Sequence, residues 1–139
     1  MSKKLTGGCA CRALRYVVEA EPILMLNCHC RDCQRASGSA YAAHVVVPKA
    51  AAHFRGPVGQ HAVVGGSGKL VHREFCPSCG SPVAIRLDTM PTILGLAAAS
   101  LDDPTLYTPS AEVFTDSAQP WNRMLEHTEK SARGMTPRP

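Results

Sequence analysis

Short apolar runs, separated by polar, glycine or proline breaks, recur along the whole chain. Runs of this length that are rich in Val, Leu and Ile are typical of β-strands. The pattern predicts strands over residues 15–20, 23–28, 40–48, 60–64, 69–76, 82–87, 92–99 and 111–116. Many short strands with little helix indicate a mainly β fold.

The clearest local pattern is a β-hairpin between residues 60 and 76. Its two arms are joined by GGSG, whose glycines supply the backbone freedom that a tight turn needs. In the second arm, the period of two predicts two faces. One face carries Leu70, His72 and Glu74, and the other carries Val71, Arg73 and Phe75.

Two segments predict short helical turns. Residues 29–38 are polar and end in a glycine, and residues 100–104 begin with Ser100, which is a favourable N-cap. The C-terminal sequence TEKSARGMTPRP has no core pattern. We therefore expect one domain over residues 1–127 and a disordered tail over residues 128–139.

Composition limits what the chain can bury and bind. Apolar residues make up 45% of the sequence but aromatic residues only 5%, so we expect a thin core. The net charge of +4 is spread without a dense basic patch, which argues against nucleic acid as a partner. No apolar stretch reaches the length of a membrane span or of a secretory signal. We expect a cytoplasmic protein without membrane association.

Seven cysteines dominate the chemistry of the sequence. In a reducing compartment, and in an odd number, they are better explained as metal-binding thiolates than as disulfides. They form the motifs Cys9-x-Cys11, Cys28-x-Cys30-x-x-Cys33 and Cys76-x-x-Cys79. The last motif is the most specific, because its spacing lets both sulfurs reach one ion. Pro77 fixes the entry of its turn, and Gly80 can take the positive φ that the turn needs.

How these cysteines share metal ions is open from spacing alone. The C-terminal pair supplies half of a tetrahedral site, which Cys9 and Cys11 can complete as a closed four-thiolate site. Alternatively, Cys30 and Cys33 complete that site and the first pair stands free. Zinc suits either arrangement, and iron is chemically possible in an all-sulfur cage.

If the outer pairs close one site, the middle motif becomes a three-ligand site with an open fourth position, which is the pattern of catalytic zinc. The alternative is a structural site completed by a histidine. His29 is a poor candidate and is expected to be a bystander, because its neighbours in the same turn already bind. The other candidates, which can reach the site only through the fold, are His44, His61 and His72.

The charge of a three-thiolate zinc site restricts its chemistry. Three thiolates on Zn²⁺ leave a net charge near −1, which weakens the ion as an activator of water. Such a site suits a substrate thiolate, or a carbonyl or hydroxyl oxygen, as its fourth ligand. The middle motif therefore favours thiol-plus-aldehyde chemistry over hydrolysis.

Four segments follow one another along residues 5–121: LTGGCACRALRY, NCHCRDCQRASGSAYAAHVVVP, REFCPSCGSPV and AEVFTDSAQPW. Together they resemble the glutathione-dependent formaldehyde-activating enzyme family, also called the centromere-protein-V/GFA family. The resemblance implies a β-tent fold stapled by a four-cysteine zinc site. It implies a structural zinc on Cys9, Cys11, Cys76 and Cys79, and a catalytic zinc on Cys28, Cys30 and Cys33.

The function implied by this resemblance is that of a zinc-dependent carbon–sulfur lyase acting on a thiol–aldehyde adduct. In the family, glutathione adds to formaldehyde to give S-hydroxymethylglutathione. The expected partners are a small-molecule thiol, with glutathione as co-substrate, and an aldehyde, while monomer and homodimer both stay open. Two alternatives on the same fold also stay open: a non-catalytic zinc-binding interaction module, and a thiol redox or metal sensor.

Some residues outside the motifs bear on this hypothesis. Glutathione is anionic, so basic side chains are candidates to receive its carboxylates, with a plain surface role as the alternative. These candidates are Arg31, Arg35, Lys49 and Arg73. Trp121 either packs over the site or belongs to the core. Arg12 stands where the family commonly has glycine, which bears on the local turn rather than on the ligands.

Overall fold

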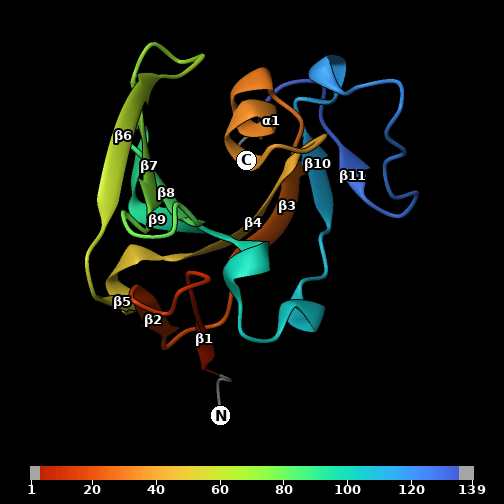
Figure 1. The fold of residues 1–139 in the computed structure, drawn as a ribbon. Helices are drawn as coiled ribbons and strands as arrows, with labels where there is room; N and C mark the ends of the chain where they lie inside the picture. The colour runs from red at the N-terminus through yellow and green to blue at the C-terminus, as the bar shows by residue number, and fades with distance from the viewer. Residues whose placement is uncertain (1–3, 135–139) are drawn as a thin grey trace.

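The computed structural model describes residues 4–134 (Figure 1). The strands are β1 (Leu5–Gly8), β2 (Arg15–Val18), β3 (Leu24–Cys28), β4 (Ala42–Pro48), β5 (Ala52–Arg55), β6 (Gly59–Val64), β7 (Leu70–Phe75), β8 (Pro82–Leu87), β9 (Met90–Ala97), β10 (Ala111–Val113) and β11 (Glu129–Lys130). The α-helix is α1 (Arg31–Ser37), and the 3₁₀ turns are η1 (Lys49–Ala51), η2 (Ala98–Ser100), η3 (Pro104–Leu106) and η4 (Thr115–Ser117). The prediction of a mainly β fold is confirmed.

The strands form two sheets, of eight strands and of three. The order in the larger sheet is β11-β10-β3-β4-β9-β8-β7-β6, and in the smaller sheet it is β1-β2-β5. Most pairs are antiparallel, but β3, β10 and β11 run parallel to one another. Because β10 pairs with β3, Val113 lies opposite Cys28 and the C-terminal part of the chain reaches the middle cysteine motif.

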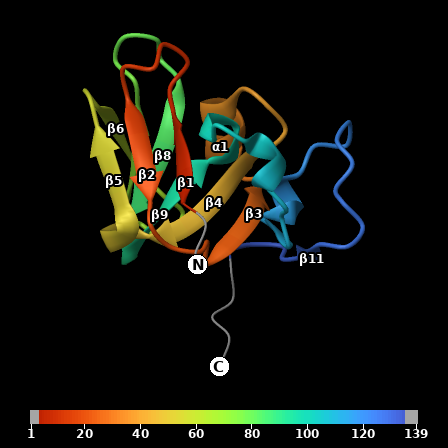
Figure 2. The ribbon, with the colours of Figure 1, turned by 90° about the horizontal axis from the view of Figure 1, so that it is seen from below.

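The smaller sheet packs against one part of the larger sheet and closes the main core between them (Figure 2). Tyr16 and Val18 of β2 are almost fully buried, as are Val45 of β4 and Leu94 and Leu96 of β9. Mostly aliphatic side chains thus make the core, as expected from a sequence poor in aromatic residues. Among residues 4–134, no helix is long and apolar enough to cross a membrane.

The β6–β7 hairpin confirms the prediction from the glycine-rich turn. Val64 lies opposite Leu70 at its end. The Gly65 N–H donates to the Lys69 carbonyl at 2.8 Å, and Gly68 has a φ of +83°. A residue with a side chain rarely adopts that φ, so the geometry of this turn requires glycine at position 68.

Other local predictions need correction. The sequence pattern misses β1, β5 and β11, because these strands are short and lack an apolar run. The helical turn predicted over residues 100–104 is misplaced, since η2 ends at Ser100 and η3 begins at Pro104. The capping side chain is Asp103, which accepts the Thr105 N–H at 3.1 Å.

Residues 128–134 differ from the predicted disordered tail. Thr128 is buried, and its hydroxyl donates to Glu112 at 2.6 Å. The following strand, β11, pairs with β10. Local composition does not show these contacts, because both partners lie earlier in the chain. The tail prediction is therefore wrong for residues 128–134, and residues 135–139 lie outside the described residues.

Candidate metal centres

The seven cysteine thiols are free and gather into two groups. Within each group, all sulfurs lie within 4.8 Å of one another. The outer group contains Cys9, Cys11, Cys76 and Cys79, and the middle group contains Cys28, Cys30 and Cys33. The alternative sharing of Cys30 and Cys33 with an outer pair does not occur in the structure. Either group could hold a metal ion.

The outer group joins two turns that are far apart in the sequence. Cys9 and Cys11 follow β1, and Cys76 and Cys79 lie between β7 and β8. The Cys11 sulfur lies 3.6 Å from that of Cys9 and 3.7 Å from that of Cys76. Tetrahedral zinc with bonds of about 2.3 Å requires about 3.8 Å between sulfurs. The spacing of these sulfurs therefore fits a closed zinc site.

Backbone groups support this arrangement. The Leu14 N–H donates to the Cys9 sulfur at 3.2 Å, which favours the thiolate form that a metal binds. Gly80 has the positive φ predicted for its turn, +78°, and its N–H donates to the Cys76 carbonyl at 2.8 Å. Arg12 has a φ of +67°, so an arginine here adopts the left-handed conformation that favours glycine.

The middle group is built where β3 passes into α1. Cys28 ends β3, Cys30 is the N-cap of α1, and Cys33 lies in its first turn. The Cys30 sulfur accepts the Cys33 N–H at 3.3 Å, so the cap that starts the helix also positions two of the sulfurs. Cys28 and Cys33 are buried, whereas Cys30 is half-buried. Cys30 is thus the most accessible thiol of the group.

Three thiols this close cannot all ionise without a cation. The hydrogen bond between Cys28 and Cys30 lowers the pKa of Cys30 to about 2, and the same contact raises the pKa of Cys28 far above its ordinary value. A divalent cation removes this conflict, because it binds each sulfur as a thiolate. The all-sulfur donor set fits a soft or borderline metal such as zinc.

His29 lies outside the ligand group but has a structural role. Its imidazole is fully buried, and Nε2 lies 3.0 Å from Glu112 Oε1 on β10. Burial raises the pKa of Glu112, but hydrogen bonds from Thr128 and His29 outweigh it, so this pKa lies below its ordinary value. The ligand group of the structure leaves out His29, as the sequence analysis expects, but the His29–Glu112 pair gives this residue a structural role because it ties the loop between Cys28 and Cys30 to β10.

Two side chains from other elements flank the Cys33 sulfur. His44 Nε2 and Arg73 Nη2 each lie 3.8 Å from it. Burial, and then the charge of Arg73, lowers the pKa of His44 to about 4, so its imidazole is neutral at neutral pH. Among the described residues, the mutually close ligand atoms of the middle group include no histidine nitrogen, whether from His44, His61 or His72. His44 therefore contacts one sulfur without completing a four-ligand set.

A cleft of about 900 Å³ is lined by Cys9 of the outer group, whereas none of the three middle cysteines lines it. One side is formed by the end of α1 and the start of β4, and the other by β7, β8 and the turn after β1. In Figure 1, α1 stands opposite the β6–β7 hairpin. His44 and Arg73 both line the cleft, which therefore reaches the two side chains that contact Cys33. Its volume lies within the usual range of small-molecule sites.

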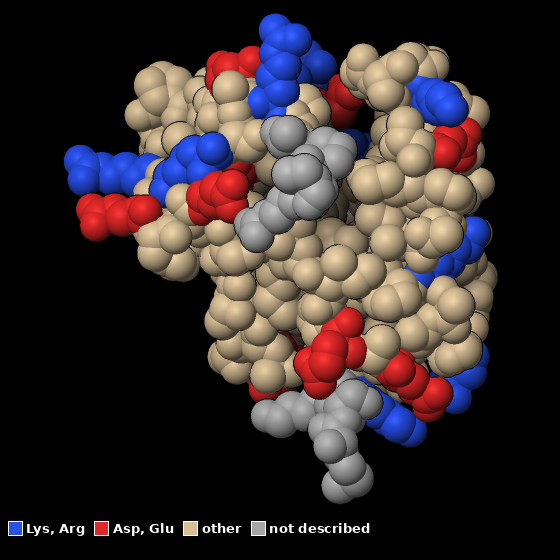
Figure 3. Space-filling model, turned by 180° about the vertical axis from the view of Figure 1, so that it is seen from behind, with Lys and Arg blue, Asp and Glu red and all other residues tan. Residues whose placement is uncertain are grey.

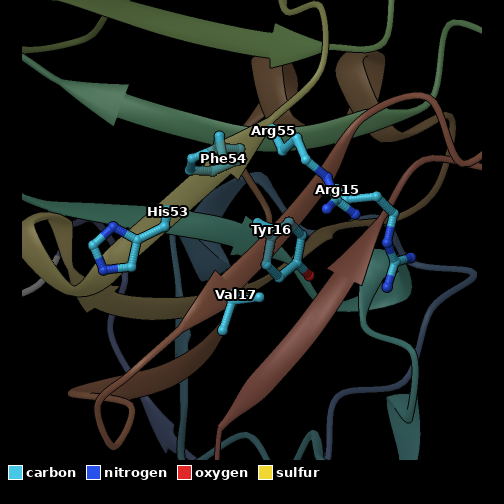
Figure 4. A pocket seen from close by; sticks show the side chains of 6 residues that line it. All are labelled: Arg15, Tyr16, Val17, His53, Phe54 and Arg55. Carbon is cyan, nitrogen blue, oxygen red and sulfur yellow. The ribbon is translucent and has the colours of Figure 1, made fainter.

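A smaller pocket of about 230 Å³ lies over β2 and β5 (Figure 4). It is lined by Arg15, Tyr16, Val17, His53, Phe54 and Arg55. Arg15 is already paired with Asp102, at 2.9 Å. Among the described residues, those lining this pocket include no cysteine, so it is separate from both candidate metal groups.

The other residues singled out in the sequence differ in whether they line the cleft. Of the four basic candidates for carboxylate recognition, Arg73 alone lines the cleft. Arg31 bonds within α1, while Arg35 and Lys49 are exposed. Trp121 is 71% exposed and does not line the cleft, so it neither belongs to the core nor packs over the site. The sequence reasoning missed Glu112, which holds His29.

The surface charge is mixed. On the face in Figure 3, Lys and Arg side chains lie near Asp and Glu side chains over a largely uncharged surface. The net charge of the chain is only +4. This face therefore lacks the continuous basic surface that a nucleic-acid backbone attracts.

Comparison with known proteins adds a family match. The protein-family model described as glutathione-dependent formaldehyde-activating enzyme matches residues 4–117, which include both cysteine groups. None of the curated proteins matches this chain. The crystal structure of a Rhodobacter sphaeroides protein, a Northeast Structural Genomics target, is similar with a TM-score of 0.56 and 22% identity, covering 70% of this chain and 87% of that chain. At this identity, the likeness shows a shared fold.

Proposed function

This chain belongs to the glutathione-dependent formaldehyde-activating enzyme family, and from this premise we propose that it catalyses the reversible addition of a thiol to formaldehyde. The observation that carries the proposal is the middle group: three cysteine sulfurs that have no fourth protein ligand among the described residues. A cleft of about 900 Å³ reaches His44 and Arg73, which contact the Cys33 sulfur. A closed four-ligand site would leave no place for a substrate atom.

The reaction conserves its atoms without a redox partner. In the forward direction, the thiol sulfur forms a bond to the aldehyde carbon, and the thiol proton ends on the aldehyde oxygen. With glutathione, the product is S-hydroxymethylglutathione. In the reverse direction, the carbon–sulfur bond breaks, the hydroxyl proton returns to the thiol sulfur, and formaldehyde is released. The protein therefore needs to bind and orient a sulfur and a carbonyl group.

Cys28, Cys30 and Cys33 are the proposed ligands of the catalytic zinc. Zinc bound there supplies a cation that keeps the substrate sulfur deprotonated and polarises the aldehyde oxygen. The chain contributes position, because the cap of α1 fixes two ligands and the His29–Glu112 pair anchors the loop between Cys28 and Cys30. The outer group is the proposed structural zinc site.

Cys30→Ser tests the proposed function. We expect the zinc content to fall by one ion per chain, and the NMR exchange rate between glutathione, formaldehyde and their adduct to fall to the uncatalysed rate. The matched control is Cys79→Ser in the outer group. This variant keeps three of the four outer ligands, so we expect it to hold the outer metal more weakly and to have a lower thermal stability. Exchange is measured below its unfolding transition, where the folded protein is expected to keep its activity. Unchanged exchange in Cys30→Ser, relative to the parent, would remove the middle group from the chemistry.

A further inference from the structure

The side chain of Gln34, on α1, is hydrogen-bonded at both ends of its amide. Gln34 is only 5% exposed. Its amide nitrogen donates to the His29 carbonyl at 2.6 Å and to the Ser117 carbonyl at 3.0 Å. Its amide oxygen accepts hydrogen bonds from Arg31 and, at 3.0 Å, from Gln119. Two carbonyls face one end of the amide and two donors face the other, so each end has partners of the right kind.

The His29 carbonyl belongs to the peptide unit that leads directly to Cys30. The preceding peptide unit is held by β10, because the His29 N–H donates to the Val113 carbonyl at 3.0 Å. Both peptide units between Cys28 and Cys30 are therefore fixed, the first by a strand and the second by the side chain of Gln34. The contact of Gln34 comes from a side chain, so a substitution can remove it without changing the backbone.

This contact lies next to the most accessible ligand of the middle group. Cys30 is half-buried, whereas Cys28 and Cys33 are buried, so Cys30 has less surrounding protein to hold it. Rotation of the peptide unit before Cys30 would move its sulfur relative to the other two. Zinc–sulfur bonds of about 2.3 Å tolerate deviations of only about 0.2 Å. The orientation of this peptide unit therefore bears directly on metal binding.

We propose that Gln34 is a positioning residue of the middle group: by holding the His29 carbonyl, it orients the Cys30 sulfur toward the metal ion. The proposal rests on the proposed function in one respect, because it assumes that a metal ion binds at the three middle cysteines. Partners one step removed from the ligands commonly set the affinity of a metal site in this way. Gln34 holds the backbone of the cysteine loop, while Glu112 holds the imidazole of His29.

A purely structural role for Gln34 has to be separated from this one. The same amide ties α1 to the segment around η4, through Ser117 and Gln119. If these bonds only stabilise the fold, loss of Gln34 exposes all seven cysteines to a similar degree. If Gln34 positions Cys30, the effect falls on the middle group and is largest at this ligand.

Alkylation of the protein by iodoacetamide in excess zinc separates the two roles, with each modified cysteine located by mass spectrometry. A thiolate bound to a metal is a poor nucleophile, so the rate at each cysteine reports how firmly it is held. Gln34→Met keeps the length of the side chain but removes its donors. We expect Cys30 to react about 10–100-fold faster in this variant than in the parent. The four outer cysteines are expected to react at unchanged rates.

Gln34→Glu identifies which end of the amide acts. It keeps the size of the side chain and the acceptor for Arg31 and Gln119, but it places an oxygen opposite the His29 carbonyl. We expect Cys30 to react as fast as in Gln34→Met, and this variant supplies the comparison if Gln34→Met does not fold. The matched control is Gln119→Met, which removes one donor to the amide oxygen and leaves the His29 carbonyl bound. Cys30 should then react at the parent rate.

Three results overturn the proposal: a parent rate for Cys30 in Gln34→Met, an equal acceleration of all seven cysteines, or restored protection in Gln34→Glu. It also fails if zinc does not protect Cys30 in the parent. The measurement contains neither a substrate thiol nor formaldehyde. Protection of Cys30 that depends on Gln34, in a protein without exchange activity, would therefore reject the proposed reaction alone. An active protein whose Cys30 is indifferent to Gln34 would reject only the positioning role.

Discussion

At the scale of single residues, Arg12 carries backbone strain that a glycine would not. Its φ of +67° costs a residue with a side chain about 1–2 kcal/mol, whereas the freedom of glycine in the unfolded chain costs about 0.4–1 kcal/mol. Arg12→Gly is therefore expected to raise the free energy of unfolding by up to about 1 kcal/mol, measured by urea denaturation of the zinc-loaded protein.

Ala10→Gly in the same turn is the control for this prediction. Ala10 is not among the described residues with a positive φ, so glycine relieves no strain there and should lower stability. A destabilised Arg12→Gly would show that the arginine side chain, and not the backbone, decides the stability of this turn.

Which residues could be assigned from the sequence depends on how local their signal is. The cysteine motifs and the positive φ of Gly80 follow from spacing within a few residues. The role of His29 depends on Glu112, which lies 83 positions later. In the local sequence, the only feature that could have pointed to Glu112 was a carboxylate between two apolar residues of a predicted strand. His44 likewise acquires its place beside Cys33 through the pairing of strands.

At the scale of elements, Glu112 holds three segments together: it lies on β10, contacts His29 after β3, and accepts the Thr128 hydroxyl before β11. Glu112→Gln keeps the shape but removes the charge, so one or more buried hydrogen bonds are lost or weakened. We expect the free energy of unfolding to fall by roughly 2–4 kcal/mol. Zinc affinity of the middle group should also fall, by about 10–100-fold, because His29 positions the loop between two ligands.

Chelator competition on the folded protein measures this zinc affinity, and denaturation measures the stability. Glu126→Gln is the control, since Glu126 is exposed and its carbonyl, not its carboxylate, accepts the Lys130 ammonium. If Glu112→Gln lowered stability while leaving zinc affinity unchanged, the pair would only pack β10 against β3. Its proposed action on the cysteine loop would then be excluded.

Asp102, which follows η2, binds the smaller sheet electrostatically and gives a pH dependence of known sign. It accepts hydrogen bonds from Thr6 of β1 at 2.7 Å and from Arg15 of β2 at 2.9 Å. The pKa of Asp102 is lowered from 3.8 to about 2, and the largest cause is the hydrogen bond from Arg15. The unfolded chain therefore binds this proton more tightly, so the stabilisation is complete above about pH 4 and disappears as the pH falls toward 2.

Asp102→Asn is expected to lower the free energy of unfolding by only about 0.5 kcal/mol at pH 6, because the pair is partly exposed to solvent. The difference between variant and parent should close as the pH falls from about 4 to 2. Denaturation curves over this range measure it. A difference that stayed constant with pH would mean that Asp102 acts through its shape and hydrogen bonds, without the charge.

At the scale of the whole molecule, the sequence was sufficient for the β class and for most strands of the larger sheet, because apolar runs of strand length carry that information. The smaller sheet was harder to predict. β1 reads LTGG and β5 reads AHFR, and neither has a pattern that requires a strand. These strands form because β2 lies between them and buries Tyr16 and Val18 against the larger sheet. The two sheets are thus defined by their mutual contact, which local patterns do not contain.

The outer cysteine group connects these sheets, since Cys9 and Cys11 follow β1 while Cys76 and Cys79 follow β7. The binding free energy of a structural zinc is comparable with the whole stability of a domain of this size. Removal of the outer metal by a strong chelator is therefore expected to abolish cooperative thermal unfolding, followed by circular dichroism. The middle group lies within a single sheet and a short helix, so loss of its metal should leave the fold in place.

The two groups should consequently release metal in two steps that differ in their structural effect. Under rising chelator concentration, we expect one ion to leave while the circular dichroism spectrum stays unchanged, and the second to leave together with unfolding. Cys30→Ser should lack the first step and keep the second, because its outer group is intact. Simultaneous release of both ions with unfolding would instead show that the middle group also carries the stability of the fold, which an open catalytic site does not require.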